Sequence, residues 1–255
     1  MKLTNSYYGI SYCLFVVAAI FFSACSKDDT PTVEPPPLPL DALYQTAITD
    51  AMVAEDSEII DTLWAITPEN QSLTWKTING KQYVLMATYM RYPASYPVGD
   101  SITNTWGESW VFVPQQMKAR IGNSLSSASD TTMRICQLLG LPPANENSNT
   151  HIAEIWISPD RLYRPAGNPD ITVTSTGATL LDNITPSYGD WFNNYIIFAY
   201  YRPLSNATEF HYPWTRLGYT YDWASESNHV GLSEYVLQAE SGAWVEHVAT
   251  VGTYF

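Results

Sequence analysis

The sequence predicts an α+β fold: a single globular domain over residues 41–255, in which early helices pack on a largely antiparallel β-sheet. Runs with helical periodicity lie mostly before residue 140, whereas β-rich runs dominate the last third of the chain. The chain has neither the regular βαβ alternation of a doubly wound sheet nor a second linker. Its hydrophobic residues (45%) and aromatic residues (14%) are enough for one sizeable core.

The first predicted elements are a helix and a hairpin. Residues 41–56 place apolar side chains on one helical stripe, with Asp41 as the N-cap. Residues 73–90 form two β-rich runs around Asn79-Gly80, a pair that tolerates the positive φ of a tight hairpin turn. We therefore expect an antiparallel pair of strands there.

The middle of the chain mixes short strands with helices. SWVFVP at 109–114 indicates a buried strand ending at Pro114, followed by a helix up to Gly122. A second helix is expected over about 130–139, because Gly140 suits a left-handed cap and prolines follow it. HIAEIWIS at 151–158 alternates as a strand does.

The last third is β-rich in composition. The expected strands are ITVT (171–174), NYIIFAYY (194–201), LGYTYDW (217–223), GLSEYVLQ (231–238) and AWVEHVATV (243–251). In the last of these, strict alternation puts Val245, His247 and Ala249 on one face of the strand.

The N-terminus has the pattern of a secretory signal peptide over residues 1–24. Lys2 supplies the positive start, an apolar run extends from Tyr12 to Phe22, and two small residues precede Cys25. An apolar run this short favours a cleaved signal over a helix that crosses a bilayer.

The stretch Phe22-Ser23-Ala24-Cys25 resembles the lipobox of bacterial lipoproteins, with Phe where Leu is usual. Ser26-Lys27-Asp28-Asp29 is similar to the acidic export tag of surface-exported Bacteroidota lipoproteins. The resemblance implies that Cys25 is acylated and holds the protein in outer-membrane lipid at the cell surface. Residues 25–40 would then be the lipidated cysteine and a proline-rich, extended linker.

Charge and cysteine content limit the function classes. Removing residues 1–24 moves the formal net charge from −13 to −14, since Lys2 is the only charge lost. So acidic a chain is a poor match for nucleic acid, whose binding depends on Lys and Arg. Cys136 lies in a helical, apolar pattern, where a buried and inert thiol is expected.

Aromatic and charged residues are densest over residues 209–235, a block similar to segments of bacterial proteins of unknown function. Aromatic faces and polar anchors of this kind suit an extracellular glycan or protein ligand, and the alternative is that they fill the core. The candidate binding residues are Trp214, Arg216, Tyr219, Tyr221, Trp223 and His229. Non-catalytic ligand binding is the leading hypothesis, and a structural subunit of a surface assembly is another.

A carbohydrate hydrolase is a further alternative, because such enzymes use two carboxyl groups in different protonation states. Asp222 and Glu234 are the candidate pair, on neighbouring strands. GLSEY at 231–235 begins like a nucleophile elbow but has Tyr where Gly is required. We expect no metal site, since the four histidines are scattered, and no cofactor, since phosphate-binding motifs are missing.

Overall fold

A computed structural model describes residues 38–126, 128–224 and 227–255. The predicted signal peptide, Cys25 and nearly all of the predicted linker lie outside the described residues. Residues Leu38–Phe255 form one compact unit. None of the described helices is both long enough and apolar enough to cross a membrane.

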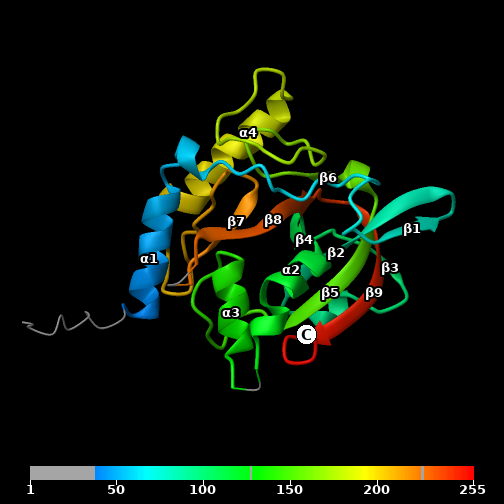
Figure 1. The fold of residues 1–255 in the computed structure, drawn as a ribbon, viewed down its shortest axis with the longest axis horizontal. Coiled ribbons are helices and arrows are strands. Elements are labelled where there is room, and N and C mark those ends of the chain that lie inside the picture. The colour runs from blue at the N-terminus through cyan, green and yellow to red at the C-terminus, as the bar shows by residue number, and fades with distance from the viewer. Residues whose placement is uncertain (1–37, 127, 225–226) are drawn as a thin grey trace, which may run out of the picture. The chain divides into compact units, whose positions relative to one another are not determined.

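The unit has the predicted α+β architecture, with nine strands in an antiparallel sheet (Figure 1). The main path runs in the order β3-β9-β5-β2-β4-β8-β6, while β1 pairs with β2 and β7 pairs with β8. The strands are β1 (Trp75–Ile78), β2 (Lys81–Met90), β3 (Ser101–Thr103), β4 (Ser109–Phe112), β5 (His151–Ile157), β6 (Leu162–Tyr163), β7 (Tyr219–Asp222), β8 (His229–Leu237) and β9 (Gly242–Thr250).

The predicted hairpin is confirmed by the register of β1 and β2, in which Ile78 pairs with Lys81. Asn79 and Gly80 have φ values of 51° and 77°, which explains why this residue pair forms the turn. The strand predicted at 151–158 is confirmed as β5, which pairs with both β2 and β9.

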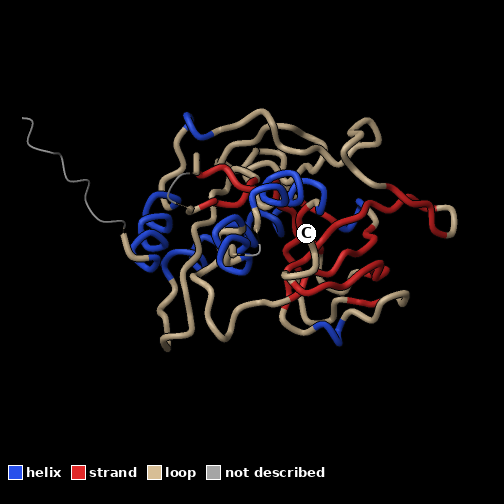
Figure 2. Tube along the Cα trace, turned by 60° about the horizontal axis from the view of Figure 1, so that its bottom comes forward, coloured by secondary structure: helices blue, strands red, loops and turns tan. Residues whose placement is uncertain are grey.

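Two helices cover one face of the sheet. They are α2 (Pro114–Ile121) and α3 (Thr131–Leu138). Figure 2 shows the helices (blue) lying beside the strands (red). Asp130 caps α3 by accepting a hydrogen bond from the Met133 N–H. Met117 and Ile135 are fully buried in one cluster with Phe112 and Leu232 of the sheet.

The other face of the sheet holds the largest core cluster. Strand residues such as Met86 and Ile155 pack there with loop residues such as Ile66, Leu73 and Tyr96. The central strands are therefore buried on both faces, by helices on one side and by loop residues on the other.

The strand predicted at 194–201 is wrong. These residues belong to α4 (Pro186–Ile196) and to the π-helical turn Ile197–Tyr201 that continues it. Thr185 caps α4 and Pro186 occupies its first turn, which together are a helix start signal. The prediction gave more weight to the aromatic and β-branched residues of the segment, which favour a strand. This helix packs with α1 (Leu40–Ala51) in a separate aromatic cluster.

Three smaller expectations also need correction. Residues 171–174 form a turn and irregular chain instead of a strand. Asp41 lies in the first turn of α1, whose N-cap is Pro39, and α1 ends at Ala51. Strict alternation along β9 is also wrong, because its register shifts beside the Glu154/Ile155 step of β5. Val245 and Val248 therefore pack in the same core cluster, and Ala249 packs in the cluster on the other face of the sheet.

Candidate functional site

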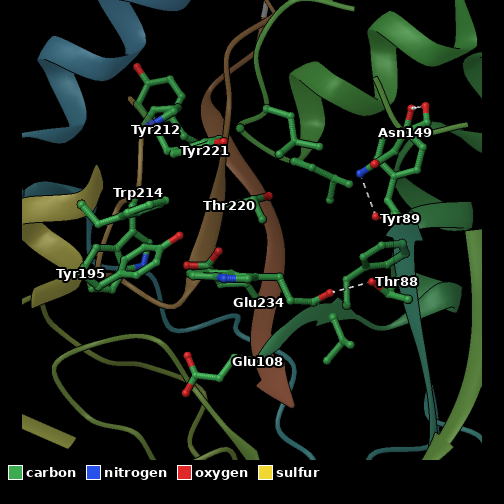
Figure 3. Close-up of a pocket in the computed structure, with 18 residues that line it drawn as sticks. Thr88, Tyr89, Glu108, Asn149, Tyr195, Tyr212, Trp214, Thr220, Tyr221 and Glu234 are labelled. Atoms are coloured by element: carbon green, nitrogen blue, oxygen red, sulfur yellow. Dashed lines mark hydrogen bonds between the residues drawn. The ribbon is translucent and has the colours of Figure 1, made fainter. Parts of the chain in front are cut away.

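A cavity of about 520 Å³ lies between the helix-covered face of the sheet, α4 and two loops (Figure 3). Its volume is in the range of small-molecule sites. The lining residues are Thr88, Tyr89, Glu108, Trp110, Val111, Phe112, Leu139, Gly140, Leu141, Asn149, Tyr195, Phe198, Tyr212, Pro213, Trp214, Thr220, Tyr221 and Glu234.

The sheet supplies the cavity with Glu234 and Trp110. Glu234 on β8 pairs with Phe112 on β4, and it shares a face with Leu232 because side chains alternate along a strand. Trp110 precedes Phe112 by two residues and so lies on that same face of β4. The antiparallel register therefore brings a carboxyl group and an indole from distant parts of the sequence into one cavity.

The end of α4 supplies an aromatic wall. The Tyr195 ring lies 4.8 Å from the Trp214 ring, nearly perpendicular to it, and 5.2 Å from the Trp110 ring. Phe198, in the π-helical turn, stacks on Tyr212 with centroids 6.0 Å apart. π-Helical turns are rare and are frequent at functional sites, and here the turn contributes a ring to the cavity wall.

Glu234 is a buried carboxyl group with an unused acceptor. Its residue is 5% exposed, and its Oε1 atom is buried without a hydrogen-bond partner among the described residues. Burial raises the pKa of Glu234 to about 8, while the Arg164 charge and the nearby Trp214 indole lower it by less. The Trp214 Nε1–H itself donates to the Pro165 carbonyl oxygen at 3.1 Å. Glu234 is therefore mostly protonated at neutral pH.

Glu108 lies at the cavity edge in a different environment, at the lower side of the group in Figure 3. Its two carboxylate oxygens accept hydrogen bonds at 2.8 Å, one from the Tyr163 hydroxyl and one from the Trp191 Nε1–H. These two donors hold the side chain in one orientation and use both of its oxygens as acceptors. The cavity thus combines a buried neutral acid with a more exposed, oriented carboxylate.

Two of the six predicted binding residues line this cavity. They are Trp214, which is 4% exposed, and Tyr221, whose hydroxyl donates to Asp50 Oδ2 at 2.7 Å. His229 stacks on Tyr221 with ring centroids 4.8 Å apart, but it is not among the lining residues.

The structure places the other three predicted binding residues in structural roles. Arg216 donates to the carbonyl oxygens at the C-terminal end of α1, at 3.0 and 3.1 Å. The Tyr219 hydroxyl donates to the Glu58 carbonyl oxygen at 2.9 Å. Trp223 is 2% exposed and its Nε1–H donates to the Leu141 carbonyl oxygen at 2.9 Å.

The two predicted catalytic carboxyl groups are not brought together in the cavity. Asp222 is completely buried and binds Arg134 through both carboxylate oxygens, whereas only Glu234 lines the cavity. Ser233, in the elbow-like stretch, is also buried and accepts a hydrogen bond from the Trp64 N–H at 2.8 Å. Its surroundings are those of a structural hydroxyl in a regular strand.

Sequence reasoning missed the cavity residues Glu108, Trp110, Tyr195 and Phe198. The helical spacing of Tyr188, Trp191 and Tyr195 behind the Thr185-Pro186 start was a usable signal for α4. Glu108 and Trp110 carried no local signal, because only the pairing of β4 with β8 brings this part of the chain to the cavity that Glu234 lines.

The described residues that line this cavity include neither a cluster of metal ligands nor the Cys136 thiol. In the part of the chain that the structure describes, no group of three or more His, Cys, Asp or Glu residues could hold a metal ion. Burial raises the pKa of Cys136 to about 11, so its thiol stays protonated at neutral pH.

The fold and the site together define an α+β domain with an aromatic cavity lined by two carboxyl groups. No protein-family model, curated protein or solved structure matches the chain.

Proposed function

We propose that this protein is a lipid-anchored protein of the outer cell surface whose folded domain binds an extracellular glycan in the cavity. The observation that carries the ligand class is the pairing of aromatic faces, from Trp110, Tyr195 and Trp214, with the buried carboxyl group of Glu234. Aromatic rings pack against the C–H faces of sugar rings, and few polar groups fix their hydroxyls.

The size of the cavity favours a small or linear ligand over a folded protein partner. At about 520 Å³ it has room for a molecule of a few rings, and a protein surface could insert only a side chain. The location at the cell surface is supported by the lipobox-like stretch ending at Cys25 and by the acidic residues after it.

Glycan-array binding followed by calorimetry tests this proposal. We expect the full mature chain to bind at least one glycan and Trp110→Ala to weaken that binding at least tenfold, which is about 1.4 kcal/mol. Trp106→Ala is the matched control, because Trp106 is 51% exposed and lies outside the cavity lining. Unchanged binding by a folded Trp110→Ala protein would contradict the proposal.

Hydrolysis of the bound glycan is a second candidate, favoured by the different environments of Glu234, which is buried, and Glu108, which is exposed. A neutral acid can protonate a leaving glycosidic oxygen, while an ionised carboxylate acts as base or nucleophile. Release of reducing ends from a bound glycan would support this activity. If the two carboxyl groups are catalytic, Glu234→Gln and Glu108→Gln should each abolish this release. Turnover that survives both substitutions would exclude Glu234 and Glu108 as the catalytic pair.

A further inference from the structure

We propose that the ligand carries a protonated amine on a sugar ring, and that this ammonium group binds in the cavity between the aromatic rings and Glu234. The inference rests on the proposed glycan binding and names the chemical class of the ligand: an amino sugar with a free amine.

The charge of the lining is the first observation. Its eighteen residues include two carboxyl groups, Glu108 and Glu234, and no Lys, Arg or His. Phosphate, sulfate and carboxylate ligands are normally held by Arg, Lys or clustered N–H donors. The lining therefore disfavours acidic sugars and leaves neutral and cationic ones.

The aromatic rings are the second observation. Tyr195 contacts both Trp110 and Trp214 at the cavity, and Figure 3 shows Tyr195 and Trp214 on one side of Glu234. The faces of Trp and Tyr attract cations, most strongly where water is excluded. A cation receives this attraction in addition to ring packing, whereas a neutral hydroxyl or amide does not.

The unused acceptor on Glu234 is the third observation. A buried oxygen without a donor costs free energy, and an ammonium group offers up to three N–H donors. A neighbouring positive charge also favours the ionised carboxylate, so Glu234 loses its proton when the amine binds. An uncharged hydroxyl could satisfy Oε1 without displacing that proton, and this difference can be measured.

The test compares a glucosamine tetramer with its fully N-acetylated counterpart, which has the same backbone and no charge. Calorimetry of the full mature chain at pH 5.5, where the sugar amine and the Glu234 carboxyl group both hold their protons before binding, in two buffers with different ionisation enthalpies, gives both affinity and proton release. We expect the free-amine tetramer to bind at least tenfold more tightly than the acetylated one. We also expect about one proton to be released per site.

Two variants separate this site from general attraction of a cation to an acidic protein. Glu234→Gln should abolish both the preference and the proton release. Asp190→Asn should preserve both, since it removes one exposed charge from α4 outside the cavity lining. An equal loss in the two variants would show non-specific attraction and would overturn the inference.

The remaining outcomes distinguish this inference from the proposed function. Equal or tighter binding of the acetylated tetramer, or binding of the free amine without proton release, overturns the amino-sugar assignment and leaves glycan binding intact. If neither tetramer binds while another glycan does, the assignment also fails alone. If no glycan binds at all, both proposals fail.

Discussion

Arg134 on α3 and Asp222 on β7 form a bidentate ion pair, with Nη1–Oδ1 and Nη2–Oδ2 distances of 3.0 and 2.7 Å. Asp222 is fully buried, and its Oδ1 atom also accepts a hydrogen bond from the Ala224 N–H. The pair ties a helix that covers the sheet to the strand beside β8, which carries Glu234.

This pair predicts that Asp222→Asn destabilises the fold. The substitution leaves the guanidinium of Arg134 without its carboxylate, and breaking a buried pair costs about 3–5 kcal/mol. Urea unfolding monitored by circular dichroism measures the change. Asp160→Asn, in a surface pair 4.0 Å apart, should cost less than about 1 kcal/mol, and equal effects would contradict a structural role for Asp222.

Glu234 predicts a pH dependence of the free energy of unfolding. Its pKa is about 8 in the folded state and its ordinary value is 4.5, so the folded state holds more protons between these values. The contribution of Glu234 to stability therefore falls as pH rises from about 4.5 to 8, by at most about 1.4 kcal/mol per pH unit. Below and above this window the contribution is constant.

Urea unfolding of wild type and Glu234→Gln across pH 4 to 9 checks this dependence. The difference between the two stability curves should change through the window and flatten beyond it. Glu146→Gln, at an exposed position, should run parallel to wild type. Parallel curves for Glu234→Gln as well would show that the carboxyl group is not buried as the structure has it.

Trp223 is expected to stabilise the fold and not to bind ligand. Its ring packs edge-on against Tyr44 at 5.5 Å, and truncation of a buried Trp costs about 3–5 kcal/mol. Trp223→Ala should therefore lower the melting temperature far more than Trp106→Ala does. A small loss of stability together with lost ligand binding would contradict this and would assign Trp223 to the ligand-binding site.

Gly231 is expected to tolerate no side chain. A Cβ atom there would lie 2.1 Å from Thr220 Oγ1 and 2.4 Å from the Thr220 carbonyl oxygen, so β7 and β8 would have to separate. Gly231→Ala should destabilise the protein by about 1–3 kcal/mol in urea unfolding. Gly252→Ala meets nothing within 4 Å and is the control, and similar values for the two would contradict the close approach.

The anchor makes a prediction at Cys25. Mass spectrometry of the protein from native membranes should find an acylated N-terminal cysteine, and Cys25→Ala should release or mislocalise the chain. Recovery of an unmodified thiol, or of a chain that still has residues 1–24, would rule out the lipoprotein assignment.

Local signals in the sequence determined part of the fold, because each acts within a few residues. Asn79-Gly80 permits the positive φ of a tight turn and Gly140 permits the positive φ that follows a helix end, and these residues predicted the hairpin and the end of α3. The preference for antiparallel strands followed in the same way from short β-rich runs without regular crossover helices.

Only the tertiary structure decided which residues form the cavity. The register of β4 against β8 brings Trp110 and Glu234 to one face, and α4 adds Tyr195, although Tyr195 and Glu234 are 39 positions apart in the chain. It also separated Glu234 from Asp222, since the first faces a cavity and the second binds Arg134. The protonation state of a carboxyl group depends on the neighbours that exclude water from it, and long-range packing selects those neighbours.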